Sequence, residues 1–159
     1  HWFDFLTTLM NGVAPTRVFA SKVRAKTQDI AAPLLAQVVI EYPTAQASLI
    51  FDGHTRLGRL DRVFVAGSKG SISSSGPDQD HQKVELTTAA GVARPKLVGA
   101  WFPDGFHGTM GELLCAIEEK REPMHSARNN LASLALCFAA VASAERGKPV
   151  VPGTVRKLP

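Results

Sequence analysis

The feature that most constrains the fold of this chain is a change in hydrophobic period, from helical at both ends to strand-like in the middle. Between residues 16 and 99, β-branched and aromatic residues occur in short alternating runs bounded by Pro, Gly, Asp and Ser. The runs predict strands near residues 16–26, 34–42, 46–52, 60–66, 70–74 and 83–89, a weaker strand near 93–99, and an edge strand at 148–151. Because the connections are too short for helical crossovers, neighbouring strands should pair antiparallel.

Helical patterns frame this region on both sides. Apolar residues spaced i, i+3, i+4 and i+7 from Trp2 predict a helix over the first dozen residues. In the last third, Thr109 and Glu112 have the spacing of a capping box for a helix to about residue 120, and Ser126 is the expected N-cap of a long helix that stops at Gly147. These patterns predict an α+β fold, with an open, mainly antiparallel sheet of about six to seven strands. The N-terminal helix and two C-terminal helices should pack on one face of that sheet.

Length, charge and hydropathy restrict the classes of protein that fit this chain. Its 159 residues suffice for a single domain spanning 1–159. There are 18 Lys and Arg residues against 14 Asp and Glu, but the basic residues are scattered, so we predict no nucleic-acid partner. The longest apolar stretch, 131–144, is interrupted by Ser133 and Ser143 and is too short for a membrane span. We therefore expect a cytoplasmic protein without a membrane partner.

Three common chemistries lack their sequence signatures. The five histidines, at positions 1, 54, 81, 107 and 125, are far apart, so no metal site is predicted. The segment Gly67-Ser68-Lys69-Gly70-Ser71 has the wrong spacing for a phosphate loop and fits a hairpin turn. A dinucleotide fingerprint would need a βαβ unit that the pattern does not contain, so no cofactor-binding residues are predicted within the chain.

The junction between the sheet and the helices concentrates polar and aromatic groups. We predict Trp101, Asp104 and His107 as substrate-binding residues, because rigid scaffolds often hold binding groups on such connections. The alternative is structural: Trp101 and Phe106 would cover the sheet edge and Asp104 would stabilise a turn. For His107 we prefer neither the substrate-binding nor the structural interpretation. For Thr109 we prefer the structural role in helix capping.

The first residues suggest that this chain is part of a longer protein. The sequence begins His1-Trp2-Phe3-Asp4 inside a predicted helix, without a methionine, a cap residue or a basic leader. We expect that groups completing the function of His1 lie upstream.

Two stretches resemble a known family. The first comprises His1-Trp2-Phe3-Asp4, Met10-Asn11-Gly12 and Thr16-Arg17-Val18. The second runs from Phe106 through Glu112-Leu113-Leu114, Ala116-Ile117-Glu118, Glu122-Pro123 and Asn130-Leu131 to Ala140, Ser143-Ala144, Gly147 and Pro149-Val150. Both are similar to the C-terminal half of the glucose-fructose oxidoreductase, inositol dehydrogenase and rhizopine catabolism (Gfo/Idh/MocA) family.

The resemblance implies an NAD(P)-dependent oxidoreductase acting on a sugar, polyol or related hydroxy compound. An N-terminal Rossmann domain, missing from this sequence, would bind NAD or NADP, and this domain would bind substrate and form a homo-oligomer through its open sheet face. His1 matches the catalytic histidine of the family. The chain alone is expected to bind no cofactor and to be inactive. Two alternatives remain, a non-catalytic dimerisation module and a stand-alone small-ligand-binding sheet domain.

Overall fold

The computed structural model describes residues 1–157, which form two compact units. The first unit combines residues 1–54 with the chain from Met124 onward, and the second is Thr55–Pro123. None of the helices described here has the length and apolar character needed to cross a membrane.

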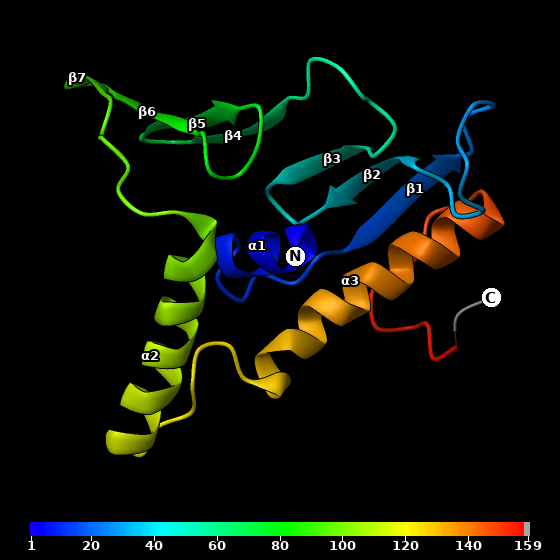
Figure 1. Ribbon diagram of the computed structural model, residues 1–159. Coiled ribbons are helices and arrows are strands. Elements are labelled where there is room, and N and C mark those ends of the chain that lie inside the picture. The colour runs from blue at the N-terminus through cyan, green and yellow to red at the C-terminus, as the bar shows by residue number, and fades with distance from the viewer. Residues whose placement is uncertain (158–159) are drawn as a thin grey trace. The chain divides into compact units, whose positions relative to one another are not determined.

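The first unit is a three-stranded antiparallel sheet covered by two helices (Figure 1). Its elements are α1 (Trp2–Leu9), β1 (Arg17–Val23), β2 (Leu35–Glu41), β3 (Gln46–Asp52) and α3 (Ala127–Arg146). The strands form a meander in the order β1-β2-β3, α3 packs along β1, and α1 packs on α3. The period-two patterning and the short connection from Glu41 to Gln46 favour this arrangement, while residues 24–34 form a longer connection from β1 to β2.

The core of this unit lies between the sheet and α3. Alternate residues of β1 and β2 are buried, because side chains of a strand point to opposite faces in turn. The buried set consists of Leu6, Val18, Ala20, Val38, Ile40, Tyr42, Leu136, Ala139, Ala140, Ala142 and Val150. The small alanines allow the backbone of α3 to lie close to β1.

The ends of α3 follow the sequence closely. The Ser126 side chain accepts a hydrogen bond from the Asn129 N–H, and Gly147 ends the helix in the left-handed conformation, as predicted. After the helix, Val150 pairs with Val18 in an isolated antiparallel bridge, with N–O distances of 2.8 and 2.9 Å. The tail thus contributes a single bridge at the position where an edge strand was predicted.

The second unit contains a four-stranded antiparallel sheet followed by a helical segment. Its elements are β4 (Asp61–Gly67), β5 (Gly70–Gly76), β6 (Lys83–Thr88), β7 (Gly91–Ala93), the irregular turn η1 (Trp101–Gly105), in which the Phe102 backbone is extended, and α2 (Phe106–Glu118). The strands are ordered β4-β5-β6-β7. A two-residue turn joins Gly67 to Gly70, which confirms the hairpin; a Cβ on Gly70 would lie 2.2 Å from the Thr87 carbonyl oxygen, so only glycine fits.

The α+β class and the antiparallel pairing are confirmed, with two differences in detail. The strands found within residues 1–157 form two open sheets, one of three strands and one of four. The predicted capping box is wrong, because α2 already begins at Phe106. Thr109 is therefore inside the first turn, where its hydroxyl donates to the Gly105 carbonyl oxygen, and Glu112 instead pairs with Arg121 at 2.6 Å.

Candidate functional site

His1 lies at the N-cap of α1, in the first unit. Its carbonyl oxygen accepts the Phe5 N–H at 2.9 Å, which closes the first turn of the helix. The residue is exposed, and its ring makes no hydrogen bond to the residues that the structure describes. The imidazole is thus presented to solvent from a backbone held by the helix.

Side-chain hydrogen bonds connect the first turns of α1 to α3. The hydroxyl of Ser133, a buried residue of α3, donates to Asp4 Oδ1 at 2.7 Å, and Thr7 Oγ1 lies 2.8 Å from the same hydroxyl. Thr7 Oγ1 also donates to the Asp4 carbonyl oxygen at 2.9 Å. The contact limits the freedom of the helix that carries His1. The sequence showed Ser133 only as an interruption of an apolar stretch, so it offered no sign of this role.

In the second unit, Trp101 and Asp104 belong to a turn held by two carboxylates. Asp104 Oδ2 accepts the Ala100 N–H at 2.7 Å, and Asp80 Oδ1 accepts the Trp101 N–H at 2.6 Å. Gly99 has φ +96°, and a Cβ there would lie 3.0 Å from Asp104 Oδ2, so glycine allows the carboxylate to approach. Asp104 therefore has the turn-stabilising role that the structural interpretation proposed, and its Oδ1 makes no hydrogen bond to the described residues. No sequence pattern indicated that Asp80 contributes to this turn.

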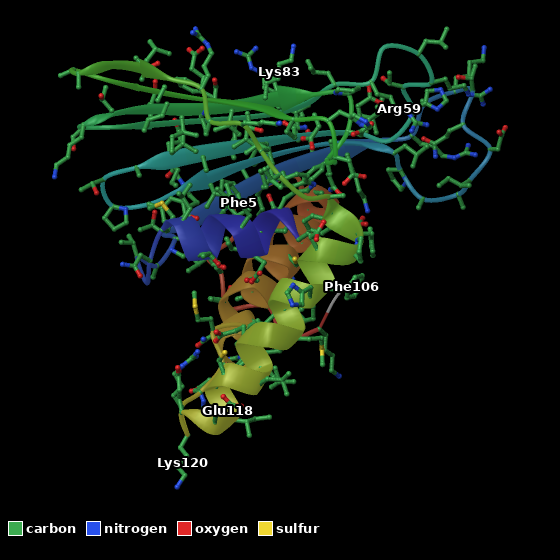
Figure 2. All side chains as sticks on the ribbon, turned by 60° about the vertical axis from the view of Figure 1, so that its left-hand side comes forward. Phe5, Arg59, Lys83, Phe106, Glu118 and Lys120 are labelled. Carbon is green, nitrogen blue, oxygen red and sulfur yellow. The ribbon has the colours of Figure 1, made fainter. Side chains whose placement is uncertain are left out.

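Three aromatic rings lie together on this turn. Trp101 and Phe102 meet edge to face with centroids 6.3 Å apart, and Phe102 lies 4.9 Å from Phe106. The three residues are between 47% and 61% exposed, so they form an accessible apolar surface. His107 follows directly and is exposed in the first turn of α2, whose two ends are marked by Phe106 and Glu118 in Figure 2.

The structure thus collects Trp101, Asp104 and His107 on one short segment of the second unit, while His1 belongs to the first unit. An exposed aromatic cluster beside an acid and an imidazole has the groups that bind hydroxylated compounds, since aromatic faces pack against apolar C–H groups and the polar groups pair with hydroxyls.

Two of the three remaining histidines, His54 and His81, have side-chain partners of their own. His54 Nε2 lies 2.9 Å from Thr27 Oγ1, and His81 Nδ1 lies 2.7 Å from Asp78 Oδ1. The contact with His81 lowers the pKa of the Asp78 carboxyl below its ordinary value. Within residues 1–157, no group of three or more His, Cys, Asp or Glu side chains is arranged to hold a metal ion.

The described residues also do not fit a nicotinamide dinucleotide in the usual manner. Binding of NAD or NADP by a Rossmann fold uses parallel strands and a glycine-rich turn leading into a helix. Every strand pair in the described part of the chain is antiparallel. A dinucleotide would therefore need a binding unit supplied by other residues.

Comparisons with known proteins link this fold to oxidoreductases. No protein-family model and no curated protein matches the chain. Among solved structures, an oxidoreductase from Agrobacterium radiobacter in complex with NAD+, L-tartaric acid and magnesium has a TM-score of 0.77 and 20% identity, over 95% of this chain and 46% of that one. An aldose-aldose oxidoreductase from Caulobacter crescentus, complexed with glycerol, has a TM-score of 0.74 and 18% identity, over 94% and 45%. A protein assigned as a myo-inositol dehydrogenase from Sinorhizobium meliloti has a TM-score of 0.70 and 25% identity, over 96% and 48%.

These neighbours are named as oxidoreductases, and two solved structures, the one from Agrobacterium radiobacter and a dehydrogenase from Bordetella pertussis, contain NAD+ and NADH. The chain spans about half the length of each neighbour, and the matched region covers nearly the whole of this chain. The chain therefore has the fold of about half of an oxidoreductase subunit of this type.

Proposed function

We propose that this chain is the C-terminal, substrate-binding domain of an NAD(P)-dependent oxidoreductase that acts on a sugar, polyol or related hydroxy compound. The observation that carries the proposal is the match of nearly the whole chain to about half of such enzymes. The dinucleotide would be held by an N-terminal Rossmann domain, because the described residues contain only antiparallel strand pairs.

His1 is the proposed proton-transfer residue. Oxidation of a carbinol requires a base for the hydroxyl proton, and an imidazole titrates close to neutral pH. Its exposed position on α1 is consistent with contact to a substrate, and the contact between Ser133 and Asp4 would keep that helix in place. The nicotinamide would accept the hydride, so without the dinucleotide-binding domain the chain would be inactive.

Trp101, Asp104 and His107 are the proposed substrate contacts. The aromatic cluster would pack against the carbon skeleton, and the Asp104 Oδ1 and the His107 ring would bind hydroxyl groups. Because these residues would bind substrate rather than take part in proton transfer, their loss should mainly raise KM.

The test uses the full-length protein. Its sequence upstream of His1 should contain a glycine-rich βαβ unit and a Glu-Lys-Pro segment, and NAD(P)H formation should be measured with a panel of sugars and polyols. His1→Gln should lower kcat by about 100-fold or more, whereas His107→Gln should mainly raise KM. The matched control is His125→Gln, an exposed histidine of the same unit as His1.

Two results would contradict the proposal. An upstream sequence without a dinucleotide-binding unit would favour a non-catalytic module. Saturable binding of a sugar or polyol by this chain alone, measured by calorimetry, together with no oxidation by the full-length protein, would favour a stand-alone binding domain.

We also propose that the chain forms a homo-oligomer through an open sheet face. Val65, Ile72 and Leu86 are register partners across β4, β5 and β6, so they lie in one row on the same face of the sheet. Ile72 is 46% exposed and Leu86 is 39% exposed, and apolar surface of this kind favours association. Light scattering should give a dimer or larger mass, and Ile72→Lys should reduce it; a monomer at micromolar concentration would contradict this proposal.

A further inference from the structure

A cleft of about 390 Å³ lies within the second unit, between the start of β6 and the segment that follows β7. The lining residues come from two segments: Asp80, Gln82, Lys83 and Val84 from the first, and Arg94, Pro95, Lys96, Leu97 and Gly99 from the second. Small-molecule sites in proteins usually enclose about 300 to 1,000 Å³. The cleft is therefore large enough for a small organic ligand. Asp80 and Gly99, which support the turn at Trp101, line it, whereas Trp101, Asp104 and His107 do not.

The charged side chains that line the cleft are mostly basic. Lys83, Arg94 and Lys96 are cationic, and Asp80 is the one acid among the lining residues. Asp80 is already engaged in the turn, since its Oδ1 accepts the Trp101 N–H at 2.6 Å. Its carboxylate therefore has a structural use.

Arg94 is held in place by an ion pair. Its Nε and Nη2 lie 2.8 and 2.7 Å from a single oxygen, Oε2 of Glu85. This geometry leaves the Nη1 N–H groups without a partner among the described residues. A guanidinium fixed in this way is a directional donor for a carboxylate or phosphate, because less rotamer freedom is lost on binding.

The two lysines are not neutralised in this manner. Neither Lys83 nor Lys96 forms an ion pair with the residues that the structure describes. Arg62 is in register with Ser75, which is in register with Lys83, so a further cation lies on the same face of the sheet. Figure 2 shows the Lys83 side chain extending away from its strand. Among the lining residues the three cations thus outnumber the single carboxylate of Asp80, while Glu85 and Asp104 lie beside the cleft, and an excess of cations in a lining attracts anions.

We infer that this cleft binds the anionic group, a phosphate or a carboxylate, of a small organic ligand. Lys83 and Lys96 supply the uncompensated charge, and Arg94 supplies directional N–H donors. The inference does not rest on the proposed oxidoreductase activity, since binding is a property of the present chain and can be measured on it.

The test follows backbone amide shifts of the ¹⁵N-labelled chain by NMR at constant ionic strength. The probes are glucose 6-phosphate, glucuronate and glucose, with inorganic phosphate as the isolated anion. Saturable shifts at residues 80–84 and 94–99 with glucose 6-phosphate or glucuronate, and none with glucose, are expected. Whichever anion binds more tightly identifies the group that the cleft prefers.

The variants are Lys83→Gln and Lys96→Gln, with Lys69→Gln as the matched control. Lys69 is an exposed lysine in the turn between β4 and β5 and does not line the cleft, and its substitution makes the same change in net charge. Each cleft variant should weaken anion binding by about tenfold, and the control by less than about twofold. Circular dichroism would establish that the variants remain folded, and the wild-type shift map is informative without them.

Three outcomes would overturn the inference. The first is that none of the anions produces saturable shifts. The second is that neutral glucose binds as tightly as the anions, and the third is that Lys69→Gln weakens anion binding as much as the cleft variants do. The last two would mean that the cleft cations do not determine the binding.

Discussion

Replacing Ser143 by alanine tests whether one buried hydroxyl joins three parts of the first unit. Ser143 lies on α3 and is fully buried. Its Oγ accepts the Ala20 N–H of β1 at 2.9 Å and donates to the Lys148 carbonyl oxygen of the tail at 2.8 Å. The helix, the edge strand and the following chain therefore meet at a single side chain.

The expected cost follows from these two hydrogen bonds. A typical intramolecular hydrogen bond contributes about 0.5–1.5 kcal/mol, and a buried group left without a partner costs about 1–3 kcal/mol. Ala20 is only 4% exposed, so water cannot easily replace the hydroxyl at its N–H. Ser143→Ala should therefore lower the free energy of unfolding by about 2–4 kcal/mol, while leaving almost no cavity.

Urea unfolding followed by circular dichroism would measure the change, with the m-value checked for constancy. The matched control is Ser21→Ala, an exposed serine of the same strand, which should change the free energy of unfolding by less than about 0.5 kcal/mol. Hydrogen exchange at the Ala20 amide should also accelerate in the Ser143 variant. A loss below about 1 kcal/mol with unchanged Ala20 protection would refute the reasoning, since the two buried groups would then have found other partners.

Three further predictions concern groups in either unit. Tyr42 is buried and its hydroxyl has no hydrogen-bond partner among the described residues, so Tyr42→Phe should stabilise the fold by about 1 kcal/mol in urea unfolding. Burial raises the pKa of Tyr42, so the wild type should lose stability as pH rises above the ordinary value of 10.0, while the variant should lack this loss; a less stable variant at neutral pH would show that the hydroxyl is bonded. Gln28 lies in the loop between β1 and β2, where its side-chain amide donates to the carbonyl oxygens of Ile30 and Ala32 at 2.8 and 2.7 Å. Because a carboxylate cannot donate these bonds, Gln28→Glu should increase proteolysis of the loop, and unchanged cleavage would contradict the role assigned to the amide. His81 lowers the pKa of Asp78, so this contact should persist below the ordinary value of 3.8 and be lost as pH falls through the lowered pKa; NMR titration of the His81 ring should show a step there that is absent in Asp78→Asn.

Strand positions were largely predictable because they depend on a local alternation. The strand expected at 46–52 coincides with β3, and the one at 34–42 differs from β2 by one residue at each end. Edge elements were less accurate. The weak strand expected near 93–99 is wrong, because β7 is Gly91–Ala93 and the chain from 94 to 99 forms no strand; the extent of β7 is set by its pairing with β6.

The start of α2 illustrates a local pattern that the wider structure overrides. Thr109 and Glu112 have capping-box spacing, yet the helix begins at Phe106, where the preceding turn is held by Asp104. Glu112 is instead drawn to Arg121, which lies beyond the helix. Capping-box spacing produces a capping box only if the helix begins at the first residue of the motif. Here the chain before Thr109 already places the start of the helix at Phe106.

Long-range polar contacts had no sequence signal at all. Ser133 and Ser143 look alike in an apolar stretch, but one binds Asp4 of α1 and the other binds Ala20 of β1. Both contacts join residues more than a hundred positions apart. Neither partner can be identified from spacing, since no periodicity relates segments so distant along the chain.

By itself, the sequence determined the class of the fold, the antiparallel pairing and the termini of α3, because hydrophobic period and capping act over a few residues. The tertiary structure alone decided that the strands divide into two sheets, that Ser133 and Ser143 fasten the helices, and that Lys83, Arg94 and Lys96 line one cleft. The physical reason is that burial, ion pairing and hydrogen bonding between distant residues depend on distances in space. The order of residues determines those distances only once the whole chain has folded.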